Sequence, residues 1–181
     1  MRISRIAVQP EKQQQGIGKR LVSDFILQIS KQIQPLDFIS VSFGMSDFLL
    51  KFWQQCGFVL VQITPNREAS SGYQSAMMLY PISEAGKQFV TQAVAKFERD
   101  ATLLPYCEAL FPNKVVDYAL DESDKQNLHG FAFAQRSFSA CFASLKRLYT
   151  QYPEELAILR DNLEQNSLTL AAPQKQTLAQ F

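Results

Sequence analysis

Hydrophobic residues in the first half of the chain follow two different periods, and the alternation between them predicts strands interleaved with helices. Short runs rich in β-branched and aromatic residues predict strands at residues 3–8, 38–43, 58–63 and 75–82. Two helical stripes lie between these runs: Leu21, Val22, Phe25, Ile26, Ile29 and Ile33 form the first, and Phe48, Leu49, Phe52 and Trp53 form the second. The expected order is therefore strand, helix, strand, helix, strand, loop and strand.

After Ile82 only the helical period remains, which marks a change of architecture. Further helices are predicted to begin near Ser83, Asp121, Phe138 and Leu156. Asp121 and Asp124 have the spacing of an acidic capping arrangement at the start of the second of these helices. We therefore predict an α/β domain over residues 1–83, followed by a small helical domain over residues 84–181.

Composition excludes several classes of protein. Hydrophobic residues make up 46% of the chain and charged residues 19%, which is typical of a globular protein. No run approaches the roughly 20 apolar residues of a membrane span, and the N-terminus lacks the pattern of a signal peptide. Cys56, Cys107 and Cys141 lie far apart, so neither a disulfide framework nor a zinc site is predicted. We expect a soluble, cytoplasmic protein with no metal and no membrane contact.

The formal net charge of +1 hides a modest asymmetry between the two halves. Residues 1–83 carry a net charge of +3 and residues 84–181 a net charge of −2. Neither value is typical of a free-standing nucleic-acid-binding domain. RNA binding would therefore require a local basic patch or a partner module that supplies most of the phosphate contacts.

The glycine pair between the first predicted strand and helix is the most informative motif. In the pattern Gln13-x-x-Gly16-x-Gly18, the helix start offers unpaired backbone N–H groups and a favourable dipole to a diphosphate. Glycine lets that backbone approach a phosphate closely, and Lys19 adds a positive charge. The side chains of Gln13 and Gln15 can bond the same group from the loop. The pattern predicts an anion site, and its alternative is ordinary turn chemistry.

Two better-known phosphate motifs are excluded by inspection. A Walker loop requires Gly-Lys-Ser/Thr, whereas Gly18-Lys19 is followed by Arg20 and no glycine stands five positions before Gly18. The dinucleotide fingerprint requires a third glycine where Leu21 stands. Binding of ATP or NAD by this chain is therefore not predicted.

Two motifs found in order resemble the GNAT acetyltransferase superfamily. Residues 5–8 (RIAV) and 13–19 (QQQGIGK) resemble its coenzyme A pyrophosphate signature, and residues 52–58 (FWQQCGF) resemble its next helix-to-strand segment. Further segments are similar to the C-terminal part of the bacterial tRNA(Met) cytidine acetyltransferase family, at residues 40–44, 67–72, 83–87 and 130–134. This resemblance runs from residue 2 to about residue 165.

The resemblance implies a partial GNAT fold and an acetyltransferase that uses acetyl-CoA to modify the exocyclic amine of the wobble cytidine in elongator tRNA(Met). The residues implied to hold the coenzyme are Ile6, Ala7, Val8, Gln13, Gln14, Gln15, Gly16, Ile17, Gly18, Lys19, Phe48 and Gln55. The backbone of residues 6–8 would pair with the pantetheine arm and polarise the thioester carbonyl. The helical part would help to dock tRNA, and the expected substrate contacts are Asn66, Arg67, Arg136, Lys146 and Arg147.

Several features depart from the superfamily pattern. The chain begins at what would be the fourth strand, so we expect the first strands to be absent, together with the upstream helicase-like module that uses ATP. The first strand then presents an edge that could support a dimer. Trp53 stands where many GNAT enzymes place a general-acid tyrosine, and an indole N–H cannot act as an acid. Glu68 is a weak candidate for the proton acceptor, and the catalytic residue is otherwise unknown.

Three functional hypotheses follow. The first is an acetyltransferase fragment that binds acetyl-CoA weakly and does not modify tRNA unaided. The second is a stand-alone GNAT N-acetyltransferase that acts on a small amine or a protein, and the third is a non-catalytic RNA-binding or assembly module. His129 is interpreted as a helix-end or interface residue and Cys56 as a buried packing residue.

Overall fold

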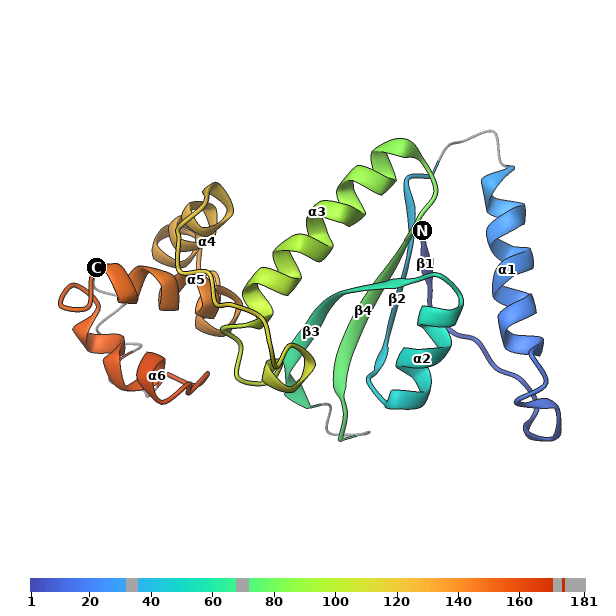
Figure 1. Ribbon diagram of the computed structural model, residues 1–181, viewed down its shortest axis with the longest axis horizontal. Helices are drawn as coiled ribbons and strands as arrows, with labels where there is room; N and C mark the ends of the chain where they lie inside the picture. The colour runs from blue at the N-terminus through green and yellow to red at the C-terminus, as the bar shows by residue number, and fades with distance from the viewer. Residues whose placement is uncertain (32–35, 68–71, 171–173, 175–181) are drawn as a thin grey trace. The chain divides into compact units, whose positions relative to one another are not determined.

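The computed structural model describes residues 1–31, 36–67, 72–170 and 174, and the chain divides into two compact units (Figure 1). Unit 1 comprises Met1–Phe97 and contains a sheet with helices, whereas unit 2 comprises Glu98–Phe181 and is helical. This confirms the predicted class, an α/β segment followed by a helical one. The two units meet between Phe97 and Glu98, inside helix α3 (Glu84–Ala101). The domain boundary at about residue 84 stays a prediction.

Four strands make the sheet of unit 1, in the spatial order β1-β2-β4-β3. They are β1 (Arg2–Ile3), β2 (Phe38–Gly44), β3 (Val59–Arg67) and β4 (Gln74–Pro81). β1 runs parallel to β2, with Ile3 opposite Val41, and the other pairs are antiparallel. β1 therefore lies at one edge of the sheet, and the dimer expected through this edge stays a prediction.

The first strand is much shorter than the sequence predicts. Only Arg2–Ile3 pairs with β2, and residues 4–9 have no regular secondary structure. Ile6 packs against the hydrophobic core but forms no strand pair with β2. Its apolar side chain therefore reflects burial and does not indicate a strand. The predicted strand over residues 3–8 is therefore wrong beyond Ile3.

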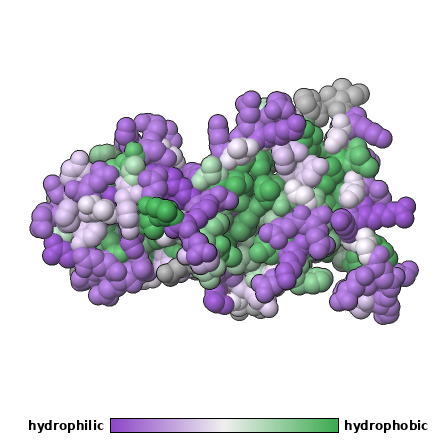
Figure 2. All heavy atoms as spheres, in the orientation of Figure 1, coloured by the Kyte–Doolittle hydropathy of each residue, from purple (hydrophilic) through white to green (hydrophobic). Residues whose placement is uncertain are grey.

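Helices α1 (Ile17–Ser30) and α2 (Asp47–Gln55) share one core with one face of the sheet. Its buried members are Val22, Ile26, Ile29, Ile39, Val41, Trp53, Cys56, Phe58 and Met78. Phe38 alternates with Ile39 along β2, so it points to the opposite face, where its ring stacks on Phe89 of α3 at 5.1 Å. Figure 2 shows hydrophobic side chains gathered over β3 and β4.

Helix α3 begins in a tight contact with the start of β2. The Ser83 hydroxyl donates to the Asp37 carboxylate at 2.6 Å and accepts from the Gly86 N–H at 2.9 Å, which caps the helix. A Cβ on Gly86 would lie 1.8 Å from the Asp37 carbonyl oxygen. The absence of a side chain at Gly86 is therefore what allows the helix to begin here.

We expect Gly86→Ala to lower the free energy of unfolding of unit 1 by about 1–2 kcal/mol. Overpacking against backbone at this distance should cost about 2–3 kcal/mol, the upper part of the usual range, and the better helix propensity of alanine returns about 1 kcal/mol. Gly130→Ala is the matched helical control, because the nearest atom there, at 3.3 Å, is Cδ of the Arg136 side chain, which can move. Urea unfolding measured by circular dichroism tests both variants, and unchanged stability of Gly86→Ala would contradict the prediction.

Unit 2 is built around helices α4 (Glu122–Phe133), α5 (Phe138–Gln151) and the short α6 (Arg160–Glu164). The Asp121 side chain accepts from the Asp124 N–H and the Asp124 side chain accepts from the Asp121 N–H, which confirms the predicted capping box. The buried core consists of Phe138, Cys141, Phe142, Leu145, Leu159 and Leu163. Within the described ranges, no helix combines the length and the hydropathy that crossing a membrane requires.

Candidate functional site

A cavity of about 640 Å³ opens in unit 1 between the segment after β1, the start of α1 and one side of α2. The structure brings eleven of the predicted coenzyme residues to its wall: Ile6, Ala7, Val8, Gln13, Gln14, Gly16, Ile17, Gly18, Lys19, Phe48 and Gln55. Gln15 is not among the lining residues, and its side chain donates to the Glu11 carbonyl at 3.0 Å instead. The separate sequence motifs therefore meet at one place.

The N-terminus of α1 carries no side-chain cap. Gly16 holds the N-cap position in the left-handed region, with φ of 77°, and no side chain accepts from the first helical N–H groups. The amides of Ile17, Gly18 and Lys19 are therefore the unpaired donors of this helix start. Because these residues line the cavity, the donors and the positive end of the helix dipole lie at its wall.

The loop before α1 is closed by its own hydrogen bonds. Gln13 Nε2 donates to the Val8 carbonyl at 3.1 Å, and Gln14 adopts a left-handed backbone with φ of 58°. The two glutamines that could bond an anion, Gln13 and Gln15, thus bond the chain itself. Their side chains therefore stabilise the shape of the loop. The backbone N–H groups and the lysine side chains are the groups that are left to contact a ligand.

Gly18 permits a close approach between α1 and α2. A Cβ at this position would lie 3.2 Å from the Phe52 ring and 3.6 Å from Val8 Cγ2. Both neighbours belong to the cavity wall or its floor, so a side chain here would push against the wall. The second glycine of the motif is therefore required by packing as well as by access to the helix amides.

The cavity wall is positively charged. Lys12, Lys19 and Lys51 line it, and no carboxylate, imidazole or thiol occurs among the described lining residues. Sequence reasoning missed Lys12, Leu49, Lys51 and Phe52. A helical repeat could have found Lys51 and Phe52, because positions 48, 51, 52 and 55 share one face of a helix. Lys12 lies in the short helix η1 (Pro10–Lys12), which no periodic pattern marks.

The segment after β1 offers backbone donors. In the described part of the chain, the N–H groups of Ile6, Ala7 and Val8 have no hydrogen-bond partner. They line the same cavity as the amides at the start of α1. A ligand with a diphosphate and a polar arm would therefore find donors for both parts, and the residues present fit acetyl-CoA on this ground.

Trp53 and Cys56 lie in the core and not on the cavity wall. Trp53 is 2% exposed, and its ring contacts those of Phe52 and Phe58 at centroid distances of 5.1 and 5.0 Å. Burial raises the pKa of the Cys56 thiol, although the charge of Lys19 acts in the opposite direction. A buried thiol with a raised pKa is a poor nucleophile, in agreement with its interpretation as a packing residue. Glu68 lies outside the described residues.

The predicted substrate residues are divided between the two units. Asn66 and Arg67 lie at the exposed end of β3 in unit 1, where Arg67 donates to the Gly72 carbonyl at 3.0 Å. Arg136 is exposed after α4, and Lys146 donates to the Asn166 side chain. The predicted substrate contacts therefore form two groups, one on each unit, and their role stays a prediction.

Arg147 is not a surface residue, and its prediction as an RNA contact is wrong. It is 0% exposed, and its guanidinium donates to Asp100 at 2.6 Å and to Asp124 at 2.9 Å. It also donates to the Asp117 and Arg99 carbonyls at 2.9 and 3.1 Å. Because α5 turns position 147 toward the acidic residues, the adjacent Lys146 and Arg147 in the sequence point to different surroundings.

His129 lies on α4, exposed, with its ring 5.0 Å from that of Phe133. It belongs to unit 2. Over the residues that the structure describes, no cluster of three His, Cys, Asp or Glu side chains is arranged to hold a metal ion.

The sheet, the two helices on its face and the glycine-bearing start of α1 are the parts of a partial GNAT acetyltransferase fold. The sequence model of the family described as GNAT acetyltransferase 2 matches residues 23–83, which cover α1 from its second turn to the end of the sheet. A second model, described as a tRNA-binding domain, matches residues 86–178, just over half of the chain. The chain therefore belongs to the tRNA-binding domain family, and a GNAT acetyltransferase segment precedes that domain.

Individual relatives agree with this assignment. The chain is 58% identical over 170 residues to the tRNA(Met) cytidine acetyltransferase TmcA of Actinobacillus pleuropneumoniae, covering 91% of this chain and 28% of that protein. It is 40% identical over 168 residues to the Salmonella typhimurium protein of the same name, covering 92% and 24%. The chain thus spans about a quarter of the length of these relatives, and the family resemblance found in the sequence is confirmed.

A solved structure was also compared. The ribosomal-protein-S18-alanine N-acetyltransferase from Escherichia coli superposes with a TM-score of 0.39 and 23% sequence identity. The superposition covers 48% of this chain and 57% of that one.

Proposed function

We propose that unit 1 binds acetyl-CoA in the cavity, as part of a longer enzyme that acetylates the exocyclic amine of the wobble cytidine in elongator tRNA(Met). The observation that carries this proposal is the uncapped start of α1, which faces a cavity lined by three lysines. The name of the relatives supports the reaction and the substrate. The aligned segment is 28% and 24% of these relatives, so the chain is proposed to act as one part of an enzyme.

The residues of the cavity would bind and orient. The amides of residues 17–19 would donate to the diphosphate, while Lys12, Lys19 and Lys51 would neutralise it. The unpaired N–H groups of residues 6–8 would hold the pantetheine arm and stabilise negative charge on the thioester oxygen. When bound, acetyl-CoA supplies the activated acetyl group. Catalysis by this chain is therefore mainly orientation and carbonyl polarisation.

The proton of the acceptor amine requires a base that the described lining residues do not supply. Glu68, in the segment after β3, is still the proposed acceptor of this proton. We propose that the isolated chain binds the coenzyme weakly and lacks activity on tRNA, and that ATP is used by an upstream helicase-like module. Robust formation of acetylcytidine by residues 1–181 alone would refute this part of the proposal.

Unit 2 would contribute to tRNA docking. The match of residues 86–178 to a tRNA-binding domain supports this role. Asn66 and Arg67 on unit 1, with Arg136 and Lys146 on unit 2, are the proposed substrate contacts that the structure leaves exposed or partly exposed. The alternative of a non-catalytic RNA-binding module predicts tRNA binding without any effect of acetyl-CoA.

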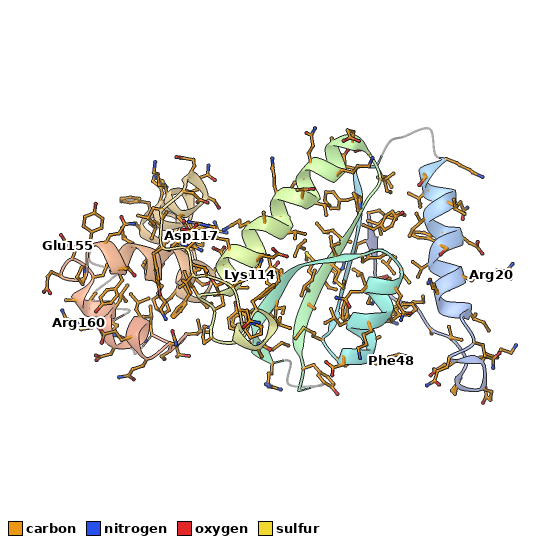
Figure 3. The ribbon with its side chains drawn as sticks, viewed as in Figure 1. Arg20, Phe48, Lys114, Asp117, Glu155 and Arg160 are labelled. Carbon is orange, nitrogen blue, oxygen red and sulfur yellow. The ribbon has the colours of Figure 1, made fainter. Side chains whose placement is uncertain are left out.

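We expect Lys19→Ala and Lys51→Ala each to weaken acetyl-CoA binding about 5- to 10-fold, because each removes a charge-assisted contact worth roughly 1–1.5 kcal/mol. Titration calorimetry with the 181-residue chain measures the change. Arg20→Ala is the matched control: Arg20 is adjacent to Lys19 but points away from the sheet and does not line the cavity (Figure 3).

A second titration with pantetheine, which lacks the diphosphate, separates the two parts of the site. The lysine variants should bind pantetheine as well as the wild-type chain does, because this ligand has no diphosphate for a lysine to contact. Equal losses for Arg20→Ala and Lys19→Ala, or no binding of acetyl-CoA by the wild-type chain, would contradict the proposed coenzyme site.

A further inference from the structure

The C-terminal half of α4 carries an exposed aromatic pair. Phe133 is 75% exposed, and the ring of exposed His129, one turn earlier, lies 5.0 Å from it at an interplanar angle of 51°. Phe131, between them in sequence, instead packs against Phe138 in the core of unit 2. The helix therefore already has its core contact, and the His129–Phe133 pair forms a separate apolar surface.

The backbone holds Arg136 against Gly130 of α4. Gln135 adopts a left-handed conformation with φ of 55°, and the chain turns so that the Arg136 N–H donates to the Gly130 carbonyl at 3.0 Å. The Arg136 side chain then lies along the helix at Gly130, where a Cβ would be 3.3 Å from its Cδ. Gly130 follows His129 directly and precedes Phe133 by about one helical turn, so the Arg136 side chain lies along the part of α4 that carries both rings.

Arg136 also differs from the other basic residues of unit 2. Each of the other described ones has a polar partner: Arg99 and Arg147 in the buried network, Lys114 with Glu98, Lys125 with Glu122, Lys146 with Asn166, and Arg160 with Glu154. For Arg136, no side-chain partner occurs among the described residues. Because the helical half has a net charge of −2, this guanidinium is a local exception in an acidic surface.

We propose that His129, Phe133 and Arg136 form a platform for one unpaired nucleobase of RNA, which stacks on the Phe133–His129 surface while Arg136 binds the neighbouring phosphate. Proteins bind unpaired bases by stacking on aromatic rings, with arginine beside them. This inference rests on the proposed tRNA-docking role of unit 2, and it names the surface that performs it. One base and one phosphate suit a unit whose described part has one guanidinium without a side-chain partner rather than a broad basic face.

Phe133→Ala tests the stacking contact. We expect it to weaken binding of an elongator tRNA(Met) transcript by the 181-residue chain about 5- to 100-fold, the range for losing one stacked base. Folding should be retained, because the Phe133 side chain projects into solvent. Val115→Ala is the matched control, since Val115 is 92% exposed in the same unit and lies outside the platform.

Two further variants separate stacking from charge. Phe133→Trp should keep the affinity and add an exposed indole whose fluorescence is quenched by the bound base, against the constant signal of buried Trp53. Arg136→Gln should lower the slope of log affinity against log salt by about 0.7–0.9, the value for one phosphate contact. Phe133→Ala should leave this slope unchanged.

The outcomes distinguish this inference from the proposed function. If the wild-type chain binds tRNA and Phe133→Ala binds equally well, the platform is overturned while tRNA docking stands. If the wild-type chain binds no tRNA, the docking role fails together with the platform. If Phe133→Ala instead abolishes self-association in sedimentation experiments without changing RNA affinity, the surface is a protein interface and the inference is wrong.

Discussion

Asp124→Ala is expected to unfold unit 2 or to lower its stability by about 3–5 kcal/mol, the cost of removing one partner from a buried ion pair. Asp124 is 0% exposed and accepts from Arg147 at 2.9 Å, from Ser144 at 2.7 Å and from Arg99 at 2.8 Å. Its loss leaves the Arg147 guanidinium, also 0% exposed, with Asp100 as its one remaining carboxylate partner in the described structure. Arg99 would lose its contact with Asp124 as well, so two arginine charges would be compensated less well in the folded state.

Urea unfolding of unit 2 measures this effect, and Glu122→Ala provides the control. Glu122 precedes Asp124 by one half-turn, but its pair with Lys125 is solvent-exposed and should contribute less than about 1 kcal/mol. A loss below 1 kcal/mol for Asp124→Ala would show that the network is not a principal source of the stability of unit 2.

The Asp124 carboxylate should also make the stability of unit 2 depend on pH in acid. Burial would raise its pKa, but hydrogen bonds from Ser144, Arg99 and the Asp121 backbone, with the charge of Arg147, lower the pKa to about 2 from 3.8. A folded-state pKa below the unfolded value stabilises the protein above the unfolded pKa. This contribution, about 2 kcal/mol, should be lost as the pH falls from about 4 to about 2, and Asp124→Ala should lack that part of the acid transition.

Ile17→Asp is expected to weaken acetyl-CoA binding about 100-fold without destabilising unit 1. Ile17 is the first residue of α1, is 40% exposed and lines the cavity. A carboxylate there interacts favourably with the helix dipole, by about 0.3–1 kcal/mol. The same carboxylate would stand where the diphosphate is proposed to bind, and like charges near a protein surface repel by a few kcal/mol at close range.

Calorimetry and thermal denaturation on the same variant give the two readouts. Ile17→Asn should lose much less affinity, because it changes the shape of the site but adds no charge. Leu21→Asp places an equal charge one turn later, at a 52% exposed position outside the cavity wall, and should bind acetyl-CoA nearly as well as the wild type. Normal binding by Ile17→Asp would contradict the assignment of the diphosphate to this helix start.

The sequence predicted those elements whose pattern has a local cause. The stripe of α1, the strands around Val41 and Met78, and the Asp121–Asp124 capping box all depend on residues close in sequence. The residues of the cavity wall were predicted where they belong to the glycine motif or to a segment that resembles the family. Lys51 was missed although it shares a helical face with Phe48 and Gln55. Lys12 was missed because it lies in the short helix η1, which no periodic pattern marks.

Two predictions were wrong because contacts with distant residues overrode a local pattern. Ile6 to Val8 have the composition of a strand, but the ladder with β2 ends at Ile3 and the segment lines the cavity instead. Arg147 sits beside Lys146 in the sequence, so both were expected at the surface, yet α5 buries one of them among aspartates. Burial of a charge is decided by partners distant in sequence, here 23 and 47 residues away.

The three cysteines give each unit its own chemical reporter. Cys56 belongs to unit 1, Cys107 and Cys141 belong to unit 2, and all three are buried as free thiols. Burial raises the pKa of Cys107 to about 12, so little thiolate forms there at neutral pH. A maleimide should therefore leave the native chain unmodified, and mass spectrometry of the labelled peptides would identify which unit opens first during denaturation.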